Sequence, residues 1–253
     1  YTLFASHVFM FLIGVIAVVY LFKHNKDAKN EVNTPSNKKI VSIAFPMFLT
    51  GLMSVVISQT DIVMLGMFNS VEEVGIYAIA IKIAYLTSFV LVAINSIATP
   101  KFSELYYSGK IDTLTTIAQK SSKLIFWISV PIIILFILFG KFILSIFGNE
   151  FIVGYSVLLI ISVGQLANGM AGSVGSFLNM TGHQIVFNRI VILGGIVNIV
   201  LNYILIPLYG ITGAAFASMI SIVLWNLIAS IYVKYKFGFY IGYVPFTAIR
   251  FNK

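Results

Sequence analysis

The stretch VGIYAIAIKIAYLTSFVLVAINSIA, residues 74–98, carries a single charged side chain, Lys82. A helix of this length rises about 37 Å, which is enough to cross the roughly 30 Å hydrocarbon core of a bilayer. An isolated strand would leave its backbone groups unpaired in lipid, so a helix is the expected structure. The stretch therefore predicts a transmembrane helix that takes an ammonium group into the membrane, where a buried charge is costly.

The composition extends this prediction to the whole chain. Hydrophobic residues make up 59% and charged residues 9% of the 253 residues, whereas a soluble domain carries roughly 25% charged residues. The mean hydropathy is +1.00. We therefore expect an all-α, polytopic transmembrane helix bundle of about seven helices, one for each long apolar run. Besides 74–98, the apolar runs are 1–22, 40–67, 124–146, 153–180, 190–208 and 212–233.

The connections between these runs alternate in charge. By the positive-inside rule, the basic connections face the cytoplasm and the acidic or uncharged ones face outward. Lys141 lies on the outer side and can snorkel to the interface. This alternation accounts for the net charge of +8 without a nucleic-acid partner. The basic side chains are Lys23, Lys26, Lys29, Lys38, Lys39, Lys101, Lys110, Lys120, Lys123, Arg189, Lys234 and Lys236, and the outer acidic ones are Glu72, Glu73 and Glu150.

The domain organisation follows from one polar linker. We expect a cytoplasmic linker at 23–39 that separates a single helix, 1–22, from a six-helix unit, 40–236. The C-terminal segment 237–253 can begin a further helix. Because the chain starts inside an apolar run without a methionine, we interpret it as an internal portion of a longer membrane protein.

Catalytic and metal chemistry have no signature here. The chain has no cysteine, and its three histidines are far apart in sequence, so thiol catalysis and cysteine-based metal sites are excluded. Phosphate-binding loops, zinc-binding histidine pairs and nucleophile elbows are also missing from the sequence. We expect no enzyme activity, no metal and no cofactor.

Polar groups within the apolar runs are the candidate functional residues. Asp61 and Lys82 lie on consecutive predicted helices, almost symmetric about a turn near residues 71–72, so we expect them at similar depth. Two interpretations remain open: a structural ion pair, or a water-filled cavity in which one or both meet a charged substrate. The neighbouring side chains that would widen this polar surface are Gln59, Thr60, Tyr77 and Asn95.

A second polar group lies in GQLANGMAGSVGSFLNMTG, residues 164–182. Small and amide side chains recur there at helical spacing, which favours close helix packing with hydrogen bonds between amides. Gln165 and Asn168 can alternatively line a cavity. The next predicted helices carry similar features, which we also interpret as packing: Gly194, Asn198, Asn202, Gly213, Ala214, Ala217 and Ser218.

Several segments resemble the polysaccharide-flippase branch of the multidrug/oligosaccharidyl-lipid/polysaccharide (MATE-like) exporter superfamily. The resemblance covers most of residues 40–236. It implies a transporter of twelve to fourteen helices in two lobes, of which 1–22 would be the last helix of the first lobe and 40–236 the second. The segments are DIVMLG (61–66), EEVGIYAIAIKIA (72–84), ATPKFSELYYSGK (98–110), GQLANGMAGSVGSFLNMTGH (164–183) and LNYILIPLYGITGAAFAS (201–218).

The resemblance also implies a function. Such proteins move lipid-linked oligosaccharides, for example undecaprenyl-diphosphate O-antigen or capsule units, across the bacterial cytoplasmic membrane by alternating access. Implied partners are the lipid-linked oligosaccharide, membrane lipid and a polysaccharide polymerase or other assembly protein. Lys82 looks like one of the basic cavity positions that meet the diphosphate, and Asp61 looks like a family position too. The candidate substrate-binding set is Lys82, Asp61, Tyr77, Asn95, Gln165 and Asn168.

Three other functions compete with this one. An ion-coupled multidrug antiporter of the same superfamily would need acidic residues in its cavity, and this region offers only Asp61 beside a lysine. A membrane glycosyltransferase or polymerase would be expected to have large outer loops or a carboxylate site. A structural subunit would pair its intramembrane charges internally, so that alanine variants would alter its abundance rather than transport.

Overall fold

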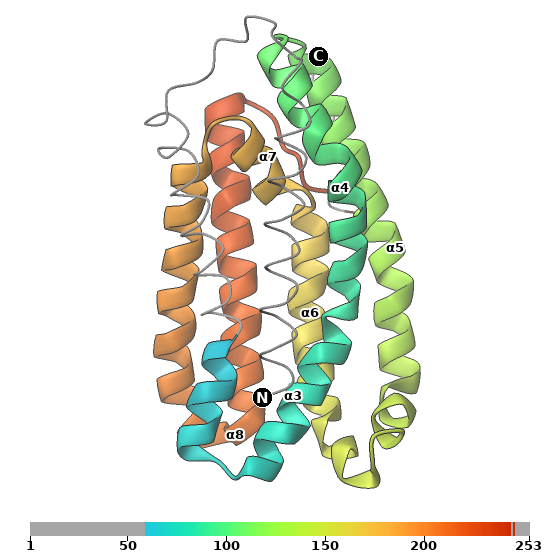
Figure 1. Ribbon diagram of the computed structural model, residues 1–253, viewed down its shortest axis with the longest axis vertical. Coiled ribbons are helices and arrows are strands. Elements are labelled where there is room, and N and C mark those ends of the chain that lie inside the picture. Colours follow the sequence, from blue (N-terminus) through green and yellow to red (C-terminus); the bar gives the residue numbers. More distant parts are fainter. Residues whose placement is uncertain (1–58, 244, 246–253) are drawn as a thin grey trace, which may run out of the picture. The chain divides into compact units, whose positions relative to one another are not determined.

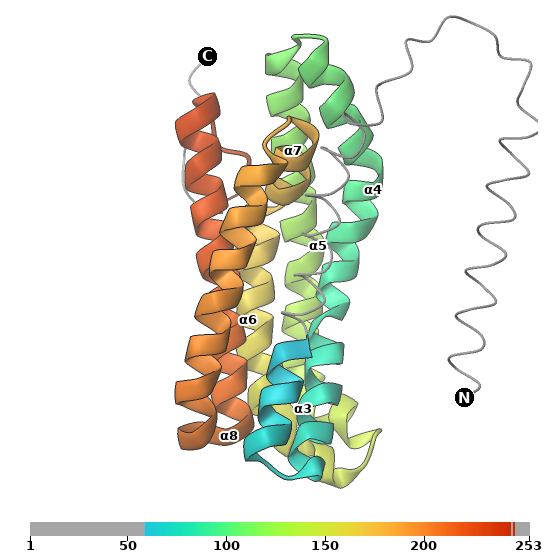
Figure 2. The ribbon, with the colours of Figure 1, turned by 60° about the vertical axis from the view of Figure 1, so that its left-hand side comes forward.

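The computed structural model describes residues 59–243 and 245, all within one unit, Ala44–Lys253. The described residues are helical throughout their length apart from short connections, and the long helices run side by side (Figures 1 and 2). This confirms the predicted all-α bundle; the runs at 1–22 and 40–58 lie outside the described residues. The elements are a helix over 59–68, α3 (Val71–Ala84), α4 (Leu86–Tyr107), α5 (Ile111–Ser145), the 3-10 helix η1 (Asn149–Gly154), α6 (Tyr155–Ala171), α7 (Val174–Met180) and α8 (Gln184–Phe237).

The described helices have membrane-spanning character. Four helical stretches are long and apolar enough to cross a bilayer: Val71–Tyr107, Ile111–Ser145, Asn149–Ala171 and Gln184–Phe237. Many large apolar side chains are exposed along them, such as Leu138 at 69% and Phe142 at 67%. An exposed apolar surface of this extent is what a bilayer, rather than water, would cover. The protein is a multi-pass membrane protein.

The longest helix, α8, folds back on itself at Gly210. This residue has φ 55° and ψ −134°, a conformation that favours glycine, and the two arms on either side of it lie antiparallel (Figures 1 and 2). Gly213 lies so close to the Leu205 carbonyl that a Cβ there would collide with it. The two arms correspond to the runs predicted at 190–208 and 212–233.

The turns sort to the two ends of the bundle as the charge alternation predicts. The turn at Asn69–Ser70, the η1 segment and the α8 fold-back lie at one end (Figure 1). The α4–α5 turn at Gly109 and the α7–α8 turn lie at the other. This second end carries the lysine-rich connections, so it is the predicted cytoplasmic end.

The helix expected over 153–180 is interrupted, and this part of the sequence interpretation was wrong. α6 ends at Ala171, and Gly172 adopts φ 63° and ψ −128° before α7 begins. The small and amide side chains that were expected to share one helix face are therefore divided between two helices, with Gly164 and Asn168 on α6 and Gly175 on α7. Close packing is nonetheless observed, because a Cβ at Gly164 would meet the Met219 Cα at 3.2 Å.

Gly172→Ala is expected to destabilise the protein more than Gly109→Ala. Both glycines have positive φ, but a Cβ at Gly172 would collide with the Ser122 side chain and lie 2.8 Å from the Ser122 Cα, whereas Gly109 has open space. We expect about 1–2 kcal/mol for backbone strain at either site and about 1–3 kcal/mol more for overpacking at Gly172. Thermal unfolding of the purified variants measures the difference; equal melting temperatures would contradict it.

Candidate functional site

The α3 N-terminus fixes which residues face each other across the first turn. The Ser70 Oγ accepts a hydrogen bond from the Glu73 amide at 3.3 Å, and Glu73 in turn accepts one from the Asn69 side chain at 2.7 Å. This serine–glutamate spacing is the capping-box sequence pattern, and acidic side chains suit a helix N-terminus. The turn therefore centres on Asn69–Ser70 rather than 71–72, and Asp61 lies opposite Tyr77, not Lys82.

Asp61 is buried and fully hydrogen-bonded. Its Oδ2 accepts from the Tyr77 hydroxyl at 2.6 Å and from the Ser218 hydroxyl. Its Oδ1 accepts from the Asn198 and Asn202 amides at 3.1 and 2.6 Å. The Asp61 side chain is 2% exposed. Four donors from three helical segments thus satisfy the carboxylate, and within the described residues it forms no ion pair with Lys82.

The Asp61 cluster (Asp61, Tyr77, Asn198, Asn202 and Ser218) supplies oxygen ligands in a buried setting. Asn202 Oδ1 has no hydrogen-bond partner among the described residues. A carboxylate together with amide and hydroxyl oxygens is a donor set suited to a proton or a hard cation. Within the described part of the chain, no group of three or more acidic, histidine or cysteine side chains is placed to hold a metal ion.

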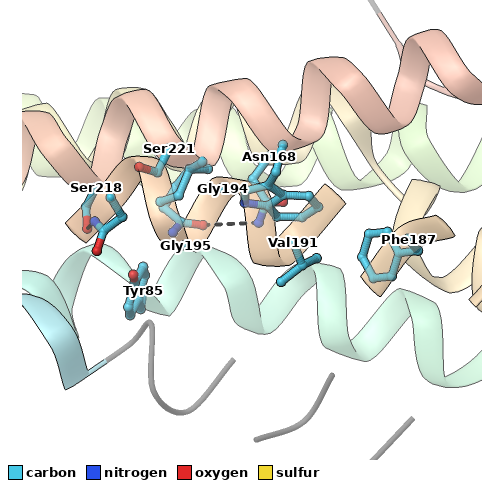
Figure 3. A pocket seen from close by; sticks show the side chains of 12 residues that line it. Tyr85, Asn168, Phe187, Val191, Gly194, Gly195, Ser218 and Ser221 are labelled. Carbon is cyan, nitrogen blue, oxygen red and sulfur yellow. Dashed lines mark hydrogen bonds between the residues drawn. The ribbon is translucent and has the colours of Figure 1, made fainter. Parts of the chain in front are cut away.

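A cavity of about 250 Å³ lies beside the Asp61 cluster, between α6, the two arms of α8 and Tyr85 at the α3–α4 junction. Asn198 and Ser218 line the cavity and also bond to Asp61. Figure 3 shows Tyr85 and Ser218 towards one end and Phe187 towards the other, with Asn168 between them. The lining consists of Tyr85, Gln165, Asn168, Phe187, Val191, Gly194, Gly195, Asn198, Ser218, Ser221, Ile222 and Trp225.

The cavity occupies the middle of the bundle. One buried apolar cluster, which includes Leu158 and Ile161, lies towards the predicted outer end. A second, which includes Ala171 and Phe177, lies towards the opposite end. The cavity lining on α6 falls between these two clusters, near the middle of the membrane. Polar side chains are rare at that depth, because hydrocarbon offers them no hydrogen-bond partners.

Gln165 and Asn168 both line this cavity and also form hydrogen bonds between amides, so features of both interpretations are present. Gln165 Oε1 accepts from the Ser88 hydroxyl at 2.7 Å and from the Asn168 amide at 3.4 Å. The Asn226 amide donates to Asn168 Oδ1 at 3.2 Å. These bonds connect α4, α6 and the second arm of α8, so the amide side chains are held in place rather than free to rotate.

Lys82 is exposed in the last turn of α3. It lies three residues before Tyr85, a spacing that places side chains on neighbouring positions of one helix face. Its position twelve residues beyond Ser70 corresponds to a depth of about 18 Å, near the middle of a bilayer core. Within the described residues it forms no ion pair. The ammonium group is therefore available to a partner outside this part of the chain.

The remaining predicted residues, Tyr77 and Asn95, lie at different places and not in the cavity. Tyr77 is completely buried and belongs to the Asp61 cluster. Asn95 lines a different hollow, formed by α4 with Ser176 of α7. Tyr85 and Trp225 line the main cavity but were not singled out by the sequence analysis, because an aromatic residue in an apolar run carries no signal of which way it faces.

Comparisons with known proteins give a consistent assignment. A family model described as MatE matches residues 46–204. The probable flippase AglR of Haloferax volcanii is 30% identical over 175 residues, covering 68% of this chain and 37% of that protein. The probable low-salt glycan biosynthesis flippase Agl15 of the same organism is 25% identical over 165 residues, covering 65% and 35%.

A solved structure supports the same fold. A MOP superfamily transporter from Pyrococcus furiosus matches with a TM-score of 0.68 at 16% identity, over 81% of this chain and 46% of that one. At this identity the likeness concerns the fold alone. The chain spans little more than a third of the length of the two curated relatives.

Proposed function

This chain belongs to the MatE family, and from this premise we propose that it forms the second lobe of a flippase that moves a lipid-linked oligosaccharide across the cytoplasmic membrane by alternating access. In this proposal residues 40–236 are the lobe, 1–22 end the first lobe and 23–39 connect the two. The names of the two Haloferax relatives, both probable flippases and one of them for glycan biosynthesis, support this class of activity.

The observation that carries the proposal is a cavity whose described lining offers amide and hydroxyl groups among apolar side chains but no charged group, one helical turn from an exposed lysine at mid-membrane depth. An ammonium group attracts a phosphate oxygen strongly where water is scarce. We propose that Lys82 contacts the diphosphate of the carrier lipid while the prenyl chain stays in the bilayer. The Asp61 cluster then holds the cavity wall through Asn198 and Ser218.

The multidrug antiporter is less well supported. A cationic substrate would be bound by an accessible carboxylate, but Asp61 is 2% exposed and already accepts four hydrogen bonds. The bacterial cytoplasmic membrane, an O-antigen or capsule unit as cargo, an undecaprenyl carrier and a polymerase partner remain predictions from the sequence resemblance. The two curated relatives are archaeal, so a polyprenyl diphosphate in general is the carrier class we propose.

Reconstitution of the intact transporter tests this function. We expect liposomes that contain it to move lipid-linked oligosaccharide, extracted from cells that lack the gene, between leaflets faster than empty liposomes do. A membrane-impermeant lectin added outside measures the fraction of glycan exposed with time. A parallel measurement of cationic dye extrusion tests the competing antiporter hypothesis. Dye transport without lipid translocation would replace the flippase by the antiporter.

A further inference from the structure

The cavity beside the Asp61 cluster combines aromatic rings with hydrogen-bonding groups that have no partner among the described residues. Trp225 and Phe187 meet edge to face, with ring centroids 5.9 Å apart. Gln165 is 5% exposed and accepts two hydrogen bonds at Oε1, yet its Nε2 donates to no acceptor in the part of the chain that the structure describes. The Trp225 indole N–H and the Tyr85 hydroxyl have no hydrogen bond within the described residues either.

Unused donors in a partly buried cavity are costly unless a ligand or water satisfies them. The kind of ligand follows from what surrounds them. Among the described residues, the lining contains no carboxylate, lysine, arginine or histidine, which disfavours a cation or a phosphate as the resident group. Aromatic faces together with amide and hydroxyl groups instead suit a ring that is apolar on its faces and carries hydroxyl or acetamido groups around its edge.

The size of the cavity limits how much of a glycan it can hold. Its volume of about 250 Å³ is below the range of about 300–1,000 Å³ that is typical of sites for drug-sized ligands. Space is available because Gly194 and Gly195 present no side chain there. A Cβ at Gly194 would also approach the Trp225 Cβ at 3.2 Å, so this glycine allows Trp225 to lie close against the first arm of α8.

We propose that this cavity is a sugar subsite, which takes one monosaccharide ring of the lipid-linked oligosaccharide. Trp225 provides the stacking face, and Gln165 and Asn168 hydrogen-bond to the ring substituents. The inference rests on the proposed flippase function and deepens it: Lys82 recognises the anionic part of the substrate, whereas the cavity recognises the sugar. Asn168 is already oriented for this role by Asn226 and Gln165.

Binding of two lipids to the intact transporter tests the subsite. The first is the lipid-linked oligosaccharide extracted from cells that lack the gene, and the second is synthetic polyprenyl diphosphate without sugar. Trp225→Ala is expected to weaken binding of the first about tenfold and to leave binding of the second unchanged. Trp225→Phe, which keeps a ring face, is expected to lose less.

Matched variants make the result specific. Trp127→Ala is the control, because Trp127 is the chain's other tryptophan, is 50% exposed and lies outside the cavity. Ser221→Leu fills the cavity without removing a ring and should reproduce the selective loss. Lys82→Ala should weaken binding of both lipids.

The possible outcomes separate the two proposals. If the Trp225 variants weaken both lipids equally, or neither, there is no sugar subsite. If Lys82→Ala changes neither lipid while Trp225→Ala acts selectively, the subsite stands and the diphosphate contact is wrong. If the wild-type transporter binds neither lipid, the flippase function and the subsite fall together.

Discussion

Lys82→Ala is expected to reduce translocation of lipid-linked oligosaccharide by about 10- to 100-fold, because a hydrogen bond to a charged partner contributes about 1.5–3 kcal/mol. Lys82 is exposed and has no ion-pair partner among the described residues, so its removal leaves no buried carboxylate behind. The amount of folded transporter should therefore stay normal. Initial translocation rates in liposomes, normalised to the amount of reconstituted protein, measure the effect.

Two further variants give this result its meaning. Lys82→Arg keeps a positive charge and should retain most of the activity, since arginine also binds phosphate oxygens. Lys101→Ala is the control and should transport normally. The Lys101 amine forms an exposed ion pair with Glu104 at 2.7 Å, and such pairs contribute only about 0–1 kcal/mol to stability. Normal transport by Lys82→Ala at normal protein levels would remove the diphosphate contact from the proposal.

Much of the fold is predictable because the bilayer imposes simple requirements. Apolar runs of sufficient length must be helical, and the distribution of lysines orders their ends. The sequence also held a readable signal for the first turn, since Ser70 and Glu73 have the capping-box spacing. The prediction instead placed the turn near residues 71–72, two residues too late, and therefore set Asp61 opposite Lys82 rather than Tyr77.

Other features depend on tertiary contacts that a single sequence does not reveal. In the sequence, Gly172 looks like one more small residue at helical spacing. In the structure its backbone is non-helical, and the helix ends there. The direction in which Tyr85 and Trp225 face is set by the rotation of their helices, and the weak amphipathic pattern of an apolar helix does not determine that rotation. The hydrogen bonds of Gln165 and Asn168 could be predicted, because an amide inside an apolar run needs a partner wherever it faces, but the sequence left open whether these residues line a cavity.

The Asp61 cluster and the cavity are coupled through shared side chains. Asn198 and Ser218 donate hydrogen bonds to Asp61 and also line the cavity. A substitution of Asp61 is therefore expected to alter the wall against which the sugar would lie.

Asp61→Ala is expected to destabilise the protein by about 3–5 kcal/mol, because it leaves several buried donors without an acceptor. The Tyr77 hydroxyl and the Asn202 amide are both completely buried, so water cannot readily replace the carboxylate. For a domain of this size the melting temperature should fall by about 6–20 °C. Thermal unfolding of the purified transporter in detergent measures the shift.

Asp61→Asn tests whether the hydrogen-bond geometry of the cluster or its negative charge is needed, because asparagine keeps the shape of the side chain but not its charge. The hydroxyls of Tyr77 and Ser218 can accept as well as donate, so an asparagine can turn its oxygen to the Asn198 and Asn202 amides and its NH₂ to the hydroxyls. We expect a loss of only about 1–2 kcal/mol.

Asp112→Ala is the matched control, since Asp112 is exposed in the first turn of α5. If Asp61→Ala and Asp112→Ala have the same melting temperature, the Asp61 cluster does not stabilise the fold. If Asp61→Asn is stable but inactive in translocation, the negative charge itself takes part in transport.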